Sequence, residues 1–235
     1  MTRAKSSLGI VALSYRIKRL SQELLGGRRV LRVCLNASWL LRRFAFELSC
    51  EMFGESFQKS ALALSGKVLR EWIPSGGSVV DIGCGTGRWC REAARHARQV
   101  VGIDYDTSSI EAARSLSPEP NIEYIVGDVT RDLADRTFDV GLLVHVIEHI
   151  DDVDSFLQSL RKLIAILIVE VPDFEADALN LVRKELDCPY YSDGDHVREY
   201  TLTILRQQLE RNGWAIRYSE HRGGAILAVA IHDKR

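Results

Sequence analysis

A chain of 235 residues can bury one sizeable core and carry an appendage. Its composition, 46% hydrophobic and 27% charged, excludes wholesale disorder, and no apolar run of about 18 residues predicts a transmembrane helix. The five cysteines include no CxxC pair, which favours reduced thiols over a disulfide framework or a zinc site. We therefore expect a cytoplasmic protein.

The overall net charge is only −1, but the start of the chain is basic. Between Met1 and Phe46 the one acidic residue is Glu23. The basic residues of the same segment are Arg3, Lys5, Arg16, Lys18, Arg19, Arg28, Arg29, Arg32, Arg42 and Arg43. Such an asymmetry predicts an anionic partner for this part of the chain.

Residues 1–75 have the apolar spacing of helices. Three stripes are present: Leu13, Ile17, Leu20 and Leu24; Val30, Val33, Ala37, Leu41, Phe44 and Leu48; Phe57, Ala61, Leu64, Val68 and Trp72. Gly26-Gly27 separates the first two, and residues 74–77 (Pro-Ser-Gly-Gly) end the third. We expect residues 1–75 to form a basic helical extension or lid, and residues 76–235 to form a second domain.

From Ser78 onward, short β-rich runs alternate with helical stretches. The predicted strands are Ser78–Ile82, Gln99–Ile103, Ile122–Val126, Phe138–Val144, Ala165–Val171, Trp214–Tyr218 and Ala225–Ile231. The predicted helices are Arg88–Ala97, Ser108–Leu116, Val153–Leu163 and one through Leu202, Leu205 and Leu209. This order predicts an α/β fold with a doubly wound, mostly parallel, Rossmann-like sheet of seven strands.

A glycine-rich turn follows the first strand. Gly83, Gly85 and Gly87 allow a sharp turn and a close approach of the backbone to a ligand. The spacing is GxGxG instead of the GxGxxG of a dinucleotide site, and Asp81 would lie poorly beside a pyrophosphate. This carboxylate suits a ligand that carries ammonium and sulfonium groups.

Two further acids end the next strands. Asp104 ends the second strand and can accept hydrogen bonds from ribose hydroxyls. Asp128 follows the third strand and can accept from an adenine amino group. Because open α/β sheets bind ligands outside the carboxyl ends of their strands, we expect Asp81, Asp104 and Asp128 to share one edge.

The set Asp81-x-Gly-x-Gly-x-Gly87, Gly102-x-Asp104, Gly127-Asp128 and His145-Val-Ile-Glu148-His149 resembles class I S-adenosylmethionine-dependent methyltransferases, and the likeness runs from about Ser60 to Ile231. The resemblance implies an enzyme that uses S-adenosylmethionine as its cofactor, with residues 76–235 as the methyltransferase domain that binds it. The residues that it implies for the cofactor site are Asp81, Gly83, Cys84, Gly85, Gly87, Asp104, Tyr105, Asp128, Val129 and Val144.

Three histidines are candidates for the acceptor side. His196, in a His-Val-Arg-Glu-Tyr-Thr segment that resembles small-molecule and sugar methyltransferases, is a candidate general base or a helix brace, with Asp195 or Glu199 orienting it. His145, Glu148 and His149, which resemble the family's EH segment, are further catalytic candidates; alternatively, Glu148 and His149 brace the loop that covers the cofactor. Their spacing shows no third metal ligand, so we expect no resident metal; a divalent ion is the less favoured alternative, suggested by similar segments in ubiquinone-pathway O-methyltransferases.

The favoured function is O-methylation of a sugar, in glycan biosynthesis, or of a lipid-linked small molecule. A quinone-type ring is the alternative acceptor, and a catalytically silent cofactor-binding scaffold is a second alternative. Pro172-Asp173-Phe174 departs from the Asn/Asp-Pro-Pro-Tyr/Phe pattern, which disfavours nucleic acid as a partner. For the basic N-terminal helices we weigh a lid against peripheral contact with an anionic membrane, with targeting or RNA binding less favoured.

Overall fold

The computed structural model describes residues 3–61, 64–190 and 194–232. The chain forms two compact units. One unit comprises Met1–Phe57 with Asp177–Tyr190, and the other comprises Gln58–Ala176 with Tyr191–Arg235. The assignment of residues 1–75 as a lid and of residues 76–235 as the cofactor domain stays a prediction.

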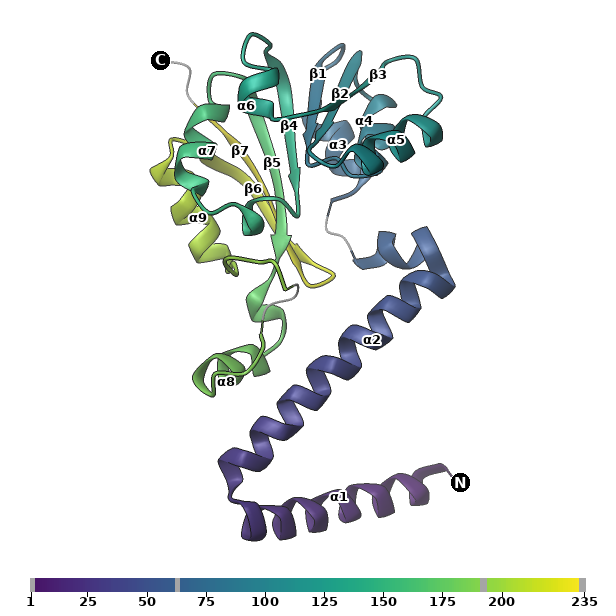
Figure 1. The fold of residues 1–235 in the computed structure, drawn as a ribbon, viewed down its shortest axis with the longest axis vertical. Helices are drawn as coiled ribbons and strands as arrows, with labels where there is room; N and C mark the ends of the chain where they lie inside the picture. The colour runs from purple at the N-terminus through teal and green to yellow at the C-terminus, as the bar shows by residue number, and fades with distance from the viewer. Residues whose placement is uncertain (1–2, 62–63, 191–193, 233–235) are drawn as a thin grey trace. The chain divides into compact units, whose positions relative to one another are not determined.

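The larger unit is built on one seven-stranded sheet of order β3-β2-β1-β4-β5-β7-β6 (Figure 1). Its strands are β1 (Ser78–Ile82), β2 (Gln99–Asp104), β3 (Ile122–Val126), β4 (Phe138–Val144), β5 (Ile164–Pro172), β6 (Ala215–Arg222) and β7 (Ala225–Ile231). The first five strands pair in parallel, and β7 runs antiparallel to both β5 and β6. The predicted doubly wound, mostly parallel fold is confirmed.

Helices cover both faces of this sheet (Figure 1). They are α3 (Gly66–Trp72), α4 (Arg88–Ala94), α5 (Thr107–Leu116), α6 (Val129–Asp132), α7 (Val153–Leu160) and α9 (Leu202–Arg211), with short 3₁₀ turns η1 (Ile147–His149) and η2 (Phe174–Ala176). Alternate strand residues point to opposite faces, so Val80 packs in the core beneath α7 and α9, and Val79 in the core beneath α3, α4 and α5. The sheet is thus buried on both sides, as its near-continuous apolar strands require.

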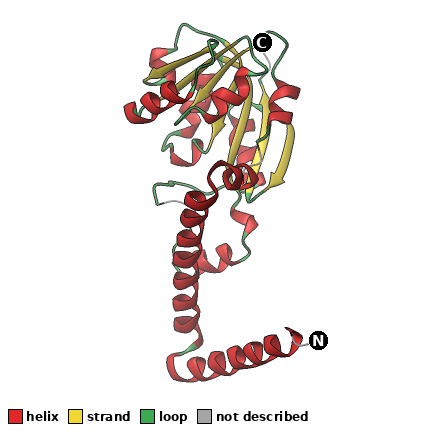
Figure 2. Cartoon of the chain, turned by 90° about the vertical axis from the view of Figure 1, so that its right-hand side faces the viewer, coloured by secondary structure: helices red, strands yellow, loops and turns green. Residues whose placement is uncertain are grey.

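The smaller unit contains α1 (Arg3–Leu25), most of α2 (Gly27–Ala61) and α8 (Leu179–Glu185), and α2 stands out as one long helix in Figure 2. Gly26, with φ of +80°, separates α1 from α2 at the predicted break. Among the residues that the structure describes, no helix has both the length and the apolar character needed to cross a membrane.

The third predicted helix differs from the structure. Phe57 and Ala61 continue α2, and α3 begins only at Gly66, after Ser65 in an extended conformation. The apolar spacing continues across this break because Leu64 and Val68 are buried in the core of the larger unit, independently of α2. Residues 62–63 lie outside the described residues.

The apolar stripe predicted on α2 points away from α8. Val33, Leu41 and Phe44 are exposed, whereas Leu35 is buried with Leu186 and Cys188 next to α8. Periodicity identifies an apolar face but does not identify the face that a neighbour covers. No helix was predicted from the sequence at the position of α8.

Candidate active site

The glycine turn connects β1 to α4 in a conformation that needs glycine. Gly83, Gly85 and Gly87 have φ of +67°, +51° and +74°, in the left-handed region that other residues rarely adopt. A Cβ on Gly87 would collide with the hydroxyl oxygen of Tyr124. The N–H groups of Gly83 and Cys84 both donate to the carbonyl oxygen of Ile103, at 2.8 and 3.2 Å, so β2 holds the turn in place.

Asp104 also braces this turn. Its Oδ2 accepts a hydrogen bond from the Gly85 N–H at 2.8 Å, and its Oδ1 accepts from the Asp106 N–H at 2.9 Å. The Gly127 N–H donates to the backbone carbonyl of Asp104 at 2.9 Å. The ends of β1, β2 and β3 therefore meet at this residue.

The three predicted carboxylates lie along one edge of the sheet. Parallel pairing sets Ile82 beside Ile103 and Asp104 beside Val126, so Asp81, Asp104 and Asp128 belong to adjacent carboxyl ends. This is the edge where open α/β sheets bind ligands. The three acids thus share the predicted edge of the sheet, and the role of each residue stays a prediction.

Asp81 is buried, with 2% of its surface exposed. Desolvation raises the pKa of its carboxyl group to about 7, against the hydrogen bond that Cys90 Sγ donates at 3.1 Å. Burial also raises the pKa of the Cys90 thiol well above its ordinary value. Cys90 is therefore a thiol that donates a hydrogen bond to Asp81. This contact was not predicted, although both residues flank the glycine turn.

Asp128 begins α6 as its N-cap. Its Oδ1 accepts from the N–H groups of Thr130 and Arg131 at 2.6 and 3.1 Å, and its Oδ2 accepts from the Tyr105 hydroxyl. Burial opposes ionisation of Asp128, but these hydrogen bonds prevail and lower its pKa. The same bond raises the pKa of the exposed Tyr105 to about 12. Tyr105 and Asp128 thus form one polar unit beside Asp104.

Three apolar or weakly polar residues of the predicted site lie at the same edge. Cys84 is buried within the turn, Val129 is buried as the first residue of α6, and Val144 is half-buried at the end of β4. The positions agree with a ligand-lining role without testing it.

A buried charge network follows β4. His145 has a φ of +55°, which is uncommon for a residue with a side chain, and its ring bridges two buried glutamates. Nδ1 lies 3.1 Å from Glu148 Oε1, and Nε2 lies 3.2 Å from Glu170 Oε1. Burial alone would lower the pKa of His145, but the two carboxylates outweigh it and raise that pKa to about 9. His145 is therefore a cation at neutral pH.

Glu170 has a second partner, the backbone N–H of Leu64, which donates to its Oε2. Glu170 was not among the predicted site residues, because an acid inside an apolar strand pattern gives no sign of which residues it will contact. Its only signal was the acid itself in the run Ile-Leu-Ile-Val-Glu-Val of β5.

Glu148 also belongs to a second group of side chains. One carboxylate oxygen of Glu148 and one ring nitrogen each of His149 and His196 lie within 4.8 Å of one another. Oε2 of the fully buried Glu148 accepts no hydrogen bond from any residue that the structure describes. The group that could hold a metal ion thus includes His196, which folding brings beside the EH segment.

The two histidines of this group have carboxylate partners of their own. Nδ1 of His149 lies 3.3 Å from Asp195 Oδ2, and Nδ1 of His196 lies 3.1 Å from Glu199 Oε1. The rings of His149 and His196 meet edge to face with centroids 4.7 Å apart. Of the two orienting acids considered for His196, the structure pairs it with Glu199.

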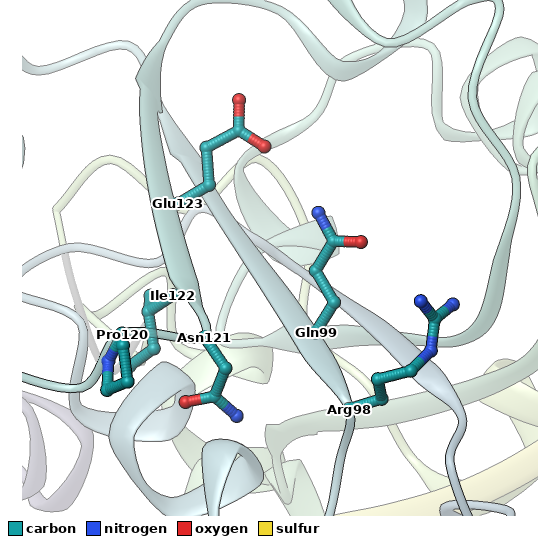
Figure 3. Close-up of a pocket in the computed structure, with 6 residues that line it drawn as sticks. All are labelled: Arg98, Gln99, Pro120, Asn121, Ile122 and Glu123. Carbon is teal, nitrogen blue, oxygen red and sulfur yellow. The ribbon is translucent and has the colours of Figure 1, made fainter.

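A pocket of about 330 Å³ lies elsewhere, lined by Arg98, Gln99, Pro120, Asn121, Ile122 and Glu123 (Figure 3). Gln99 and Ile122 are the first residues of β2 and β3. The pocket is therefore at the amino ends of these strands, opposite the edge that carries the carboxylates, and it plays no part in the cofactor site.

Comparison with known proteins agrees with this geometry. Residues 55–219 match the model of a family described as "Methyltransferase domain". A ubiquinone biosynthesis O-methyltransferase of Rhodopseudomonas palustris (strain HaA2) is 30% identical over 71% of this chain and 66% of that protein. One of Mesorhizobium japonicum is 38% identical over 37% of this chain and 36% of that protein. The chain thus spans between about a third and two thirds of these relatives.

Solved structures show the same fold. An S-adenosylmethionine-dependent methyltransferase from Mesorhizobium loti has a TM-score of 0.56 at 20% identity, covering 72% of this chain and 98% of that one. One from Aquifex aeolicus has a TM-score of 0.56 at 17% identity, covering 71% and 88%. The predicted resemblance in fold is confirmed.

Proposed function

We propose that this chain, which belongs to the methyltransferase domain family, transfers a methyl group from S-adenosylmethionine to a hydroxyl oxygen on a quinone-type ring. The observation that carries the proposal is the shared edge of Asp81, Asp104 and Asp128 next to the Glu148, His149 and His196 group. The names of the relatives favour this acceptor over the sugar expected from the sequence.

The glycine turn and its three acids form the donor half of the proposed site. S-adenosylmethionine, when bound, supplies a methyl carbon activated by the adjoining sulfonium. Asp104 holds the turn open through Gly85 and presents a carboxylate to the ribose, and Asp81 offers negative charge to the cationic methionine end. Positioning of this kind provides much of the rate gain in a two-substrate transfer.

The Glu148, His149 and His196 group forms the acceptor half. Its donor set, one carboxylate and two imidazoles, fits a divalent ion, and the buried Glu148 Oε2 without a hydrogen bond from the described residues supports that fit. Such an ion would lower the pKa of an acceptor hydroxyl. His145 and Glu170 would fix the orientation of Glu148, as outer partners of metal ligands do.

The role of His196 then distinguishes two versions of the site. If His196 is the predicted base, His196→Ala should slow turnover about 10²–10⁴-fold and leave the metal content unchanged. If His196 is a metal ligand, the same substitution should lower both the amount of bound metal and the activity. Mass spectrometry of the purified variants measures their metal content and separates the base from the ligand. If His196 is a ligand, Glu148→Gln should lose metal as well.

The main test is a transfer assay with radiolabelled methyl donor. We expect methylation of catechol and hydroquinone acceptors, loss of activity with a chelator, and recovery on adding back Mg²⁺, Mn²⁺ or Zn²⁺. Methylation of sugars but not of phenols would overturn the quinone-type acceptor. Normal donor binding by titration calorimetry with no transfer to any acceptor would support the silent scaffold instead.

A further inference from the structure

We propose that His221, held by Asp173, is the general base that takes the proton from the acceptor hydroxyl. This inference rests on the proposed function and names a residue pair that the glycine turn, the strand-end acids and the EH segment do not include. Both residues belong to the larger unit, His221 on β6 and Asp173 immediately after β5.

The pair has the arrangement of an oriented imidazole base. Nδ1 of His221 lies 2.8 Å from Asp173 Oδ2, the His221 side chain is 47% exposed, and the Asp173 side chain is 9% exposed. A largely buried carboxylate thus fixes one ring nitrogen, and Nε2 makes no hydrogen bond to any residue that the structure describes. In Ser-His-Asp enzymes the same pairing selects the tautomer whose Nε2 accepts a proton.

Strand pairing puts this pair on the carboxyl edge of the sheet. Pro172 at the end of β5 pairs with Ala225 at the start of β7, and His221 pairs with Ile226. The Asp173 N–H donates to the carbonyl oxygen of Gly224 at 2.8 Å. The β6–β7 hairpin is thereby fastened to the end of β5, beside the strand that carries the EH segment.

Two short stretches of chain limit the distance between the His221–Asp173 pair and the group of Glu148, His149 and His196. The Val197 N–H donates to the carbonyl oxygen of Glu148 at 2.9 Å, and Tyr200 forms a bridge with Asp173. Three extended residues span at most about 10 Å. Glu170, which contacts His145, is also three residues from Asp173. The two groups are therefore connected by short lengths of chain at the same edge of the sheet.

The other histidines of this edge are less suited to the task. Both ring nitrogens of His145 lie beside carboxylates, so neither is left to receive a proton from an acceptor. His196 has 5% of its side chain exposed, and its ring packs against that of His149 within the group that fits a divalent ion. His221 combines a fixed ring with access from solvent.

In the proposed step, an oxygen lone pair of the acceptor forms the new bond to the methyl carbon, and the carbon–sulfur bond breaks with its electron pair going to sulfur. The sulfonium becomes a neutral thioether. The acceptor hydroxyl proton moves to His221 Nε2, and Asp173 stabilises the imidazolium that results until the proton passes to water.

The test compares His221→Gln, Asp173→Asn and the control His232→Gln, in the full chain. His232 bonds to the carbonyl oxygen of Ile164 at the opposite edge of the sheet, at 2.8 Å. With a catechol acceptor we expect kcat of His221→Gln to fall about 10²–10³-fold, with KM for the acceptor within about threefold. Asp173→Asn should also lower kcat, and His232→Gln should keep the kcat of wild type.

Chemical rescue gives a readout that a structural role would not. Added imidazole should restore turnover to His221→Ala and should not affect wild type. Turnover of His221→Gln within threefold of an active wild type would overturn the base and leave the proposed function standing. An inactive wild type that binds S-adenosylmethionine normally would overturn the proposed function, and the inference with it.

Discussion

The carboxyl group of Asp81 is buried near the end of β1. Because burial shifts its pKa, the stability of the protein should depend on pH. Its pKa is about 7 in the folded chain and near 3.8 when unfolded, so the folded state binds the proton more tightly between these values. The free energy of unfolding of the ligand-free protein should therefore fall as pH rises from about 4 to 7, by a few kcal/mol at most.

Asp81→Asn should remove this dependence. The variant should be more stable than wild type at pH 8 by about 1–3 kcal/mol, and no more stable at pH 4, while it binds S-adenosylmethionine more weakly. Denaturant unfolding at both pH values measures the effect. The exposed Asp135→Asn serves as control, and an unchanged pH slope in Asp81→Asn would refute the assignment.

Asp104 offers a second test at the scale of one residue. Asp104→Ala removes a carboxylate that accepts from Gly85 and that we expect to accept from the ribose. Donor binding should weaken by about 1–3 kcal/mol, as measured by titration calorimetry. The control is Asp106→Ala, which removes the N-cap of α5 and should cost about 1 kcal/mol of stability without changing the dissociation constant. Equal affinities of Asp104→Ala and wild type would exclude Asp104 from the site.

At the scale of elements, α8 is fastened to α2 by a buried arginine. Arg183 is 2% exposed and donates through Nη1 to the Leu35 carbonyl and through Nη2 to Ser38 Oγ, both at 2.8 Å. Arg32 of α2 donates in return to the carbonyl oxygen of Leu186. The segment after β5 thus leaves the sheet and packs with a helix far away in the sequence.

Arg183→Met should loosen this packing, because methionine keeps much of the length and loses every donor. We expect α8 to open more easily by about 1–3 kcal/mol, so that amides of residues 177–190 exchange faster while those of β1, β4 and β5 do not change. Hydrogen exchange with mass spectrometry measures this. Lys184→Met, at an exposed neighbouring position, is the control, and equal exchange in both variants would contradict the arrangement.

At the scale of the whole molecule, the basic start of the chain remains to be assigned a partner. Arg16, Lys18 and Arg19 are exposed on α1 beside exposed apolar residues such as Leu13 and Ile17, a combination typical of helices that bind anionic lipid surfaces. We propose peripheral binding to such a surface, which would bring the chain to a lipid-linked acceptor; the cytoplasmic location stays a prediction.

Neutralising Arg16, Lys18 and Arg19 to Gln should weaken binding to phosphatidylserine vesicles about 10²-fold, since each basic residue near the surface contributes about 1 kcal/mol. Cosedimentation of the full chain measures this, with phosphatidylcholine vesicles as the neutral comparison. Donor binding should be unaffected. Equal sedimentation of the variant and wild type would exclude α1 from lipid binding and leave the lid as the simpler role.

Local sequence patterns were enough to predict the sheet and the edge that carries the three acids. Strand runs and strand-end acids are local patterns, and the rules for parallel sheets turn them into a shared edge, so β1, β3, β4 and β7 have the predicted bounds and Asp81, Asp104 and Asp128 lie where expected. The glycine spacing predicted the sharp turn after β1 for the same reason, because a positive φ is a property of a single residue.

The contacts between distant side chains follow from the packing of the whole fold and could not be predicted from local patterns. His196 joins Glu148 across 48 positions, Glu170 joins His145, and Asp173 joins His221, and each meeting depends on how a loop closes after a strand. The apolar period of α2 likewise did not reveal that α8 packs on the other face. Periodicity records the direction in which a side chain points from its own element; the residue that it meets is set by the packing of all the elements together.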